Sequence, residues 1–442
     1  MSLVKQPAKV IPPSGRDLLP RLFAGVFGIF LGLSLLKFGN PPIFESWVTS
    51  PSNGYEFMLN SWPITWGYGL LALVAVLGLA AARWKVTAPG WLVVLPLAWL
   101  LWQALAATQT LSWALTRPTL AHFAACAACF YLGLFSLGQG RGLNPLWLGL
   151  IGAFVLVLAI GFQQRFGGLD ETRRYFMLYL YPQMKEVPPE LLKRLSSSRI
   201  FSTLFYPNAL AGAVLLLLAP VLGAIGRAHR LFTASARYFL MTLIGLASFA
   251  CLYWSGSKGG WLLMLTLGLI ALLRLPLGKR FKTLLLTGVL LAGLTGFFWR
   301  YSGFFHRGAT SVSARFDYWS AAVQTAQARP IFGTGPGTFF LAYQKVRRSE
   351  SEPSRLVHND YLEQASDSGL PGFALYTLFI AAALFRGYRN ARADWQRFWV
   401  WLGTLGWALQ SLLEFGLYIP ALAWPAFALL GWLVGQRRTE LE

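Results

Sequence analysis

The stretch ALAGAVLLLLAPVLGAI, residues 209–225, contains no polar or charged side chain. An apolar run of this kind approaches the length that a helix needs to cross the roughly 30 Å hydrocarbon core of a membrane. The whole chain has the same character: 55% of its 442 residues are hydrophobic, 12% are charged and its mean hydropathy is +0.51. A soluble domain carries roughly 25% charged residues. The sequence therefore predicts an all-α polytopic membrane protein.

Similar apolar runs recur along the chain, and we expect residues 1–442 to form a single integral membrane domain with about twelve transmembrane helices. The candidate spans are 22–38, 64–82, 91–107, 120–137, 145–162, 209–225, 238–253, 260–273, 283–299, 372–385, 398–413 and 417–434. Two long polar loops interrupt the series, residues 163–207 and 300–369, and short helices are expected in both. In the first loop, residues 188–195 (PPELLKRL) predict a short amphipathic helix, either on the membrane surface or in solvent.

The distribution of positive charge predicts the orientation in the membrane. The net charge is +21, but Lys and Arg lie at the ends of apolar runs instead of clustering on one soluble face, so we exclude nucleic acid as a partner. If the amino terminus is inside, more than half of the 38 Lys and Arg residues fall in the termini and the short inner connections. The positive-inside rule then places both termini in the cytoplasm and both long loops outside it.

The loop 300–369 is the largest polar segment and the expected place for chemistry. Residues 313–319 (SARFDYW) open a helix that Pro330 ends, with Arg315 one turn from Trp319. On spacing we expect Phe316, Trp319 and Val323 to pack on one face of it. Arg315 is either a ligand-binding cation or a solvated surface arginine, and these residues alone do not decide between the two.

A glycine-rich turn and a histidine follow in the same loop. Residues 330–339 (PIFGTGPGTF) permit a close backbone approach, but they lack the Gly-Lys-Ser/Thr sequence of a nucleotide-binding Walker loop. His358 is expected to open a short helix, 358–366, whose amino terminus favours a neutral imidazole able to accept a proton. A purely structural histidine is the alternative, and Asp360, Glu363 and Asp367 are alternative bases.

Lys258 stands in the turn 254–260 (WSGSKGG) between two short expected spans. A cation near the membrane rim is expensive and needs a partner, and a lipid-linked phosphate would supply one. The alternative is a lysine that snorkels to the interface. Cys126 and Cys129 lie inside an apolar span and are expected to be packing residues, and the sequence has no Asp-x-Asp metal motif. We therefore expect no metal and no other cofactor.

These features together suggest metal-independent transfer from an anionic, lipid-linked substrate. The chain also resembles the superfamily of O-antigen ligases and O-antigen polymerases, bacterial envelope glycosyltransferases. The motifs that carry the resemblance are SRIFSTLF at 198–205 followed by PNALA at 207–211, SKG at 257–259, Arg315 with Trp319, PIFGTGPGTF at 330–339 and HNDYL at 358–362, with Gly369 and Gly372 beyond.

The resemblance implies transfer of a glycan from undecaprenyl pyrophosphate to an acceptor sugar hydroxyl at the periplasmic face of the bacterial inner membrane. It implies His358 as the base that deprotonates the acceptor and arginines such as Arg315 as the cations that hold the pyrophosphate. Attack from the face opposite the lipid would invert the anomeric centre. Arg199 and Lys258 are further candidate cations, although relatives more often have arginine where Lys258 stands. The expected supporting residues are Asn208, Trp319, Asn359, Asp360 and Tyr361.

The leading expectation is an O-antigen ligase that joins a preassembled glycan to a lipid A core or a similar acceptor in lipopolysaccharide maturation. A polymerase of the same superfamily would use the same donor and a second lipid-linked chain as acceptor, and a protein O-oligosaccharyltransferase would use a protein. A lipid or glycan transporter is the alternative from another class. It should place ionisable residues at mid-membrane, whereas this sequence concentrates them in two outer loops.

Overall fold

The computed structural model describes residues 15–84, 87–137, 144–181, 197–306, 310–347 and 351–435, and within these residues the chain is helical with no strand. The first half contains α1 (Gly15–Lys37), η1 (Pro42–Trp47), α2 (Gly54–Leu59), α3 (Ile64–Ala81), α4 (Gly90–Ala106), η2 (Ala107–Gln109), α5 (Trp113–Tyr131), η3 (Leu132–Leu137), α6 (Asn144–Gln163), η4 (Gln164–Gly168), α7 (Leu169–Tyr175) and η5 (Phe176–Leu180). The second half contains α9 (Pro207–Arg227), α10 (Ala234–Ser255), α11 (Lys258–Arg274), α12 (Lys279–His306), α13 (Thr310–Ala328), α14 (Phe339–Val346), α15 (Asp360–Ala391), α16 (Trp395–Gln410), η7 (Gly416–Tyr418) and α17 (Pro420–Val434).

The prediction of an all-helical multi-pass membrane protein is confirmed. In the described part of the chain, nine helices are long and apolar enough to cross a membrane. Three more of the expected spans are helical but shorter, since α11, α16 and α17 have 17, 16 and 15 residues. The count of twelve spans therefore stays a prediction. The amphipathic helix expected at 188–195 lies outside the described residues.

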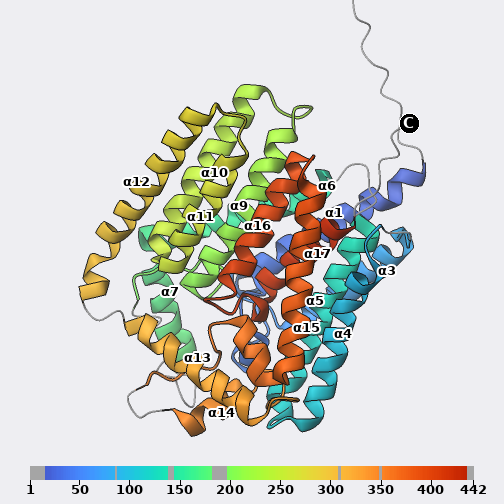
Figure 1. Cartoon of the computed structure of the whole chain (residues 1–442), viewed down its shortest axis with the longest axis vertical. Helices are drawn as coiled ribbons and strands as arrows, with labels where there is room; N and C mark the ends of the chain where they lie inside the picture. The colour runs from blue at the N-terminus through green and yellow to red at the C-terminus, as the bar shows by residue number, and fades with distance from the viewer. Residues whose placement is uncertain are drawn as a thin grey trace, which may run out of the picture.

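The core of the bundle forms around α17, in which every residue is buried. A helix that is apolar on all sides belongs inside a bundle. Glycine allows its neighbours to come close: a β-carbon on Gly431 would lie 2.0 Å from the Phe130 carbonyl oxygen of α5. In contrast, α12 lies at the edge of the bundle, and only Phe297 and Tyr301 of its 28 residues are buried (Figure 1).

One end of the bundle gathers the segments that matter for function. α16 ends there and α17 begins there, and α1 ends beside them, since the Ala421 N–H donates to the Phe38 carbonyl at 3.0 Å. α13 and α14 lie obliquely across the same end, below the upright helices (Figure 1). Because α1 runs toward this end and α17 runs away from it, residues 15 and 435 lie near the opposite end.

The segment after His358 begins differently from the sequence expectation. His358 does not open a helix: its φ of 57° is left-handed, and Asn359 caps α15 by accepting the N–H groups of Tyr361 and Leu362. The helical conformation is interrupted at Gly369, as expected, with φ 72° and ψ −179°, and the Leu370 N–H donates to the Pro330 carbonyl at 2.8 Å. Glycine makes this break possible, because a β-carbon on Gly369 would meet the Ile331 carbonyl oxygen at 2.1 Å. α15 thus consists of a short helix before Gly369 and the tenth expected span after it.

Candidate active site

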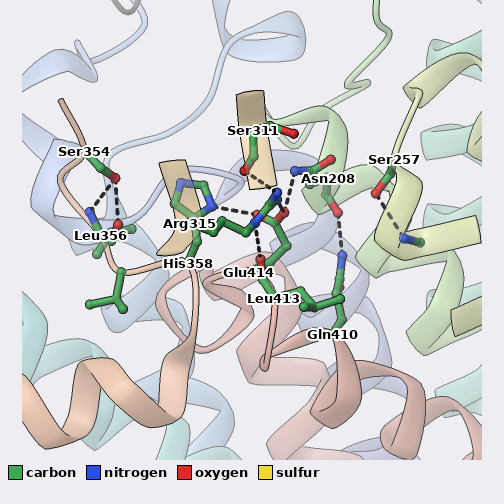
Figure 2. A network of polar contacts seen from close by, with 12 residues as sticks. Asn208, Ser257, Ser311, Arg315, Ser354, Leu356, His358, Gln410, Leu413 and Glu414 are labelled. Carbon is green, nitrogen blue, oxygen red and sulfur yellow. Dashed lines mark hydrogen bonds and ion pairs between the residues drawn. The ribbon is translucent and has the colours of Figure 1, made fainter. Parts of the chain in front are cut away.

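The polar side chains at this end of the bundle converge on Glu414, which lies in the connection between α16 and α17. Oε2 of Glu414 is 3.0 Å from Nδ1 of His358. Oε1 accepts a hydrogen bond from Nδ2 of Asn208 at 2.5 Å and pairs with Nη2 of Arg315. Figure 2 shows the three side chains pointing at this carboxylate from different segments of the chain. Glu414 is not among the residues that the sequence motifs predicted for the site.

The connection that carries Glu414 is held firmly. Leu417 is clamped through both of its backbone polar groups: its N–H donates to Oδ2 of Asp360 at 2.7 Å, and its carbonyl oxygen lies 2.7 Å from Nε2 of His122. The Asp360 N–H donates in turn to the Ser411 carbonyl at 2.8 Å. Asp360 is fully buried, so its role here is to fix this connection and not to meet solvent.

Arg315 projects from α13, as expected, but its surroundings are not those of a solvated arginine. Nε donates to the Leu413 carbonyl and Nη1 to the Ser311 carbonyl, both at 3.1 Å, while Nη2 meets Glu414. All three nitrogens are therefore engaged within the protein.

The packing of α13 corrects the expected face. Phe316 and Val323 are 60% and 41% exposed. The side chains of α13 that are buried are smaller or lie on a different face of the helix. They are Ala314, Tyr318, Ala321, Ala322, Thr325 and Ala326. Several of them pack against Phe339 and Tyr343 of α14. Alanines and tyrosines thus form most of the packing between α13 and α14, and the larger Phe316 side chain stays exposed.

His358 is fixed in place by its neighbours. Its ring stacks on Tyr318 at a centroid distance of 5.8 Å and meets Phe415 edge-on at 4.8 Å. Trp319 Nε1 donates to the His358 carbonyl at a long 3.4 Å. Among the residues that the structure describes, none forms a hydrogen bond with Nε2 of His358, and the side chain is 25% exposed. Nε2 is therefore the nitrogen open to a substrate.

Arg199 and Asn208 extend the network toward α10. Nη2 of Arg199 donates to Oδ1 of Asn208 at 2.8 Å, and Nε donates to the Ser255 carbonyl at 2.6 Å. Asn208 lies in the first turn of α9, where its carbonyl accepts from Nε2 of Gln410 at 2.7 Å. Burial lowers the pKa of Arg199, an effect that the nearby Glu414 opposes.

Lys258 lies at the start of α11, ahead of the expected span 260–273, and is held by aromatic rings. Its Nζ is 3.9 Å from the ring centroid of Phe304 and 5.3 Å from that of Tyr301. No carboxylate in the described part of the chain pairs with it. Burial, followed by the positive charges of Arg199, Arg315 and Arg300, lowers its pKa to about 8. Lys258, Arg199, Arg315 and Arg300 thus lie close enough together for their charges to interact.

The three carboxyl groups that were expected as alternative bases lie away from solvent. Asp360, Glu363 and Asp367 are fully buried along α15, and each accepts one backbone N–H from a different segment. The donors are Leu417 for Asp360, Val357 for Glu363 and Gly337 of the glycine-rich turn for Asp367. Their burial and these bonds favour a role in holding the site segments together, against both a catalytic base and a transport pathway.

The comparisons with known proteins support the family resemblance. The family model described as O-antigen ligase matches residues 243–377. Over this region the chain is similar to the O-antigen ligase superfamily. The matched region contains Lys258, Arg315 and His358, whereas Arg199, Asn208 and Glu414 lie outside it.

A further relative is an uncharacterized protein of Haemophilus influenzae, which is 28% identical to this chain over 159 residues. That alignment covers 31% of this chain and 40% of the relative. The chain thus matches less than half of the length of that protein.

Two residues of the candidate site were absent from the sequence expectation. Glu414 is the only acidic residue between 395 and 435, and an isolated carboxylate within apolar sequence was a usable signal. Arg300 lies over the rings of Tyr253 and Tyr301 at 4.8 and 5.5 Å, and it had no signal beyond its charge. Tyr361 links the start of α15 to α16, since its hydroxyl donates to the Ala408 carbonyl of α16 at 3.1 Å.

No group of three His, Cys, Asp or Glu side chains in the described ranges is arranged to hold a metal ion. Metal independence stays a prediction. Cys126 and Cys129 are buried free thiols, in agreement with a packing role.

Proposed function

We propose that this protein is a glycosyltransferase that moves a glycan from undecaprenyl pyrophosphate to an acceptor sugar hydroxyl, without a metal and with inversion of the anomeric centre. The observation that carries the proposal is that His358 and Arg315 meet at Glu414, and that Arg199 is joined to the same carboxylate through Asn208. The charge of Lys258 lies close to those of Arg199 and Arg315. A base and an excess of cations at one point are what attack by a hydroxyl and departure of a pyrophosphate require.

The donor would bind through its pyrophosphate. Within the described residues, the contacts of Lys258 and Arg300 are with aromatic faces, so their N–H donors are available to phosphate oxygens. Arg199 and Arg315 supply further charge but are already bonded within the protein. We therefore assign direct phosphate contacts first to Lys258 and Arg300, and to Arg199 and Arg315 the stabilisation of charge on the leaving group.

The acceptor would be activated by His358. Nε2 takes the proton from the sugar hydroxyl as the oxygen attacks the anomeric carbon. The bond from that carbon to the phosphate oxygen breaks at the same time, and the pyrophosphate leaves with the electron pair. The four cations meet the charge that develops on it.

The site is proposed to face the periplasm. Charge distribution predicts cytoplasmic termini, and the structure supports this orientation because residues 15 and 435 lie near the end of the bundle opposite Glu414. At that end lipid-linked sugars are the expected donors, and a lipid A core the expected acceptor.

Reconstituted transfer tests the proposal. The purified protein in lipid nanodiscs is incubated with an undecaprenyl-pyrophosphate-linked glycan, with and without lipid A core and with a chelator. Transfer to the core that survives the chelator is expected. Chain extension without core would instead establish the polymerase, and translocation of an unchanged donor across vesicles would establish the transporter. Loss of transfer with the chelator would refute metal independence.

A further inference from the structure

Glu414 has a role beyond pairing with cations. We propose that Glu414 is the positioning residue that keeps the proton of His358 on Nδ1, so that Nε2 presents its lone pair to the acceptor. The inference rests on the proposed function only where it concerns transfer, since the position of the proton is a property of the substrate-free protein.

The groups around the carboxylate of Glu414 determine where the proton of His358 lies. Arg315 has donors only, and it occupies Oε1 of Glu414. Asn208 also meets Oε1 with its amide nitrogen, and its orientation is fixed because Arg199 must donate to the amide oxygen. Oε2 is left for His358 at 3.0 Å, and an ionised carboxylate can only accept. A neutral imidazole at this place must therefore carry its hydrogen on Nδ1.

The carboxyl group of Glu414 stays ionised at neutral pH. Burial alone would raise the pKa of this carboxyl, but Arg315 and then His358 outweigh burial and hold it at about 2. The side chain is 11% exposed, so water competes little for its oxygens. The acceptor facing Nδ1 is thus permanent at neutral pH.

Neither partner can easily turn away. The imidazole is held between Tyr318 and Phe415, and Phe415 follows Glu414 directly in the chain. The connection itself is clamped at Leu417 by Asp360 and His122. When Nε2 takes the proton from the acceptor hydroxyl, the positive imidazole is met by a carboxylate already in place.

The substitution Glu414→Gln separates this role from simple ion pairing. Glutamine has nearly the same shape but one acceptor oxygen and one NH₂ group. Two donors, from Arg315 and Asn208, converge on the Oε1 position, so the amide oxygen belongs there and the NH₂ group turns to His358. The imidazole must then accept on Nδ1 and carry its hydrogen on Nε2, where it can no longer act as a base.

The experiment uses the full-length protein labelled with ¹⁵N-histidine in detergent, without substrate, and the variant His358→Ala assigns the resonance. Wild type is expected to show the Nδ1–H tautomer and Glu414→Gln the Nε2–H tautomer. In the transfer assay kcat should fall at least ~100-fold while the KM for donor changes less than about threefold. Glu414→Asp, which keeps an acceptor-only carboxylate, should retain Nδ1–H and recover part of kcat.

Asp317→Asn is the matched control, because it removes a negative charge from α13 at a residue whose side chain accepts a hydrogen bond from Ser351 and, among the described residues, from no other side chain. It should alter neither the tautomer nor kcat. Observation of the Nε2–H tautomer in the wild-type protein, or of the Nδ1–H tautomer in Glu414→Gln, would overturn the proposal. This holds even if that variant folds poorly or no glycan donor is ever found. A flipped tautomer with kcat unchanged would overturn the role of Glu414 in transfer.

Discussion

The long loop 300–369 and the short connection 411–419 contribute to the same site in opposite ways. The loop carries eight Lys and Arg, six carboxylates and two histidines, whereas the connection has one charged residue, Glu414. Yet the loop residues His358 and Arg315 both attach to Glu414. Cations of the loop such as Arg329, Lys345 and Arg347 are exposed and cost little, but a lone carboxylate between buried helices must be paired. The many charged residues of the loop indicated where the site lies. The single carboxylate of the connection, Glu414, is the point at which the site residues meet.

The largest expected effect tests whether the loop supplies the chemistry. His358→Ala should lower kcat for glycan transfer by about 10²–10⁴-fold, the usual contribution of a general base. The measurement is steady-state transfer in nanodiscs. His306→Ala is the matched control, since His306 lies in the same loop at the exposed end of α12, and it should retain full activity. Full activity in His358→Ala would remove the loop from the proposed mechanism.

The next effect compares a buried ion pair with an exposed one. Arg315→Ala leaves Glu414 buried without its main partner and should lower the free energy of unfolding by about 3–5 kcal/mol. Arg227→Ala removes an exposed pair with Asp394, whose side chains are 59% and 40% accessible, and should cost less than about 1 kcal/mol. Unfolding in mixed micelles measures both. Equal losses would mean that the connection does not depend on the loop for its stability.

The pH dependence of the KM for donor tests the role of Lys258. Its pKa is lowered to about 8, so its ammonium loses the proton between pH 7 and 9, and the KM for donor should rise over that range. Lys258→Arg should abolish this rise, because arginine stays charged. Lys258→Met should raise the KM at pH 7 by about tenfold, as expected for a lost bond to a charged group.

Lys258→Met should also unfold at a higher temperature at pH 7. A lysine whose pKa is lower in the folded protein than in the unfolded chain destabilises the fold fully below the folded value. That cost fades as the pH rises from about 8 toward the ordinary value of 10.5. A less stable Lys258→Met variant, or a KM independent of pH, would contradict the assignment of Lys258 to the donor.

The smallest effect concerns a weak contact inside the loop. Trp319→Phe removes the 3.4 Å hydrogen bond to the His358 carbonyl and should lower kcat only about twofold, since such a long neutral bond contributes little. Trp299→Phe, at a 79% exposed position near the end of α12, should have no effect. A loss comparable with that of His358→Ala would mean that Trp319 contacts the substrate itself.

The sequence by itself determined the membrane-spanning helical architecture, the family resemblance and four of the candidate site residues. These follow from apolar length, from the positions of Lys and Arg, and from local motifs around Arg199, Lys258, Arg315 and His358, all of which are properties of short segments. Helix ends were partly predictable: Gly369 and Pro371 indicated a stop, and the helical conformation breaks at Gly369, but His358 lies outside the helix that it was expected to open.

Only the tertiary structure decided which side chains face one another. Glu414 lies 56 positions from His358 and 99 from Arg315 in the sequence, so no local pattern joins them. The structure also showed that Asp360, Glu363 and Asp367 are used by backbone N–H groups of three distant segments. The physical reason is that the cost of burying a charge is offset only by partners in space, and the fold determines where those partners lie.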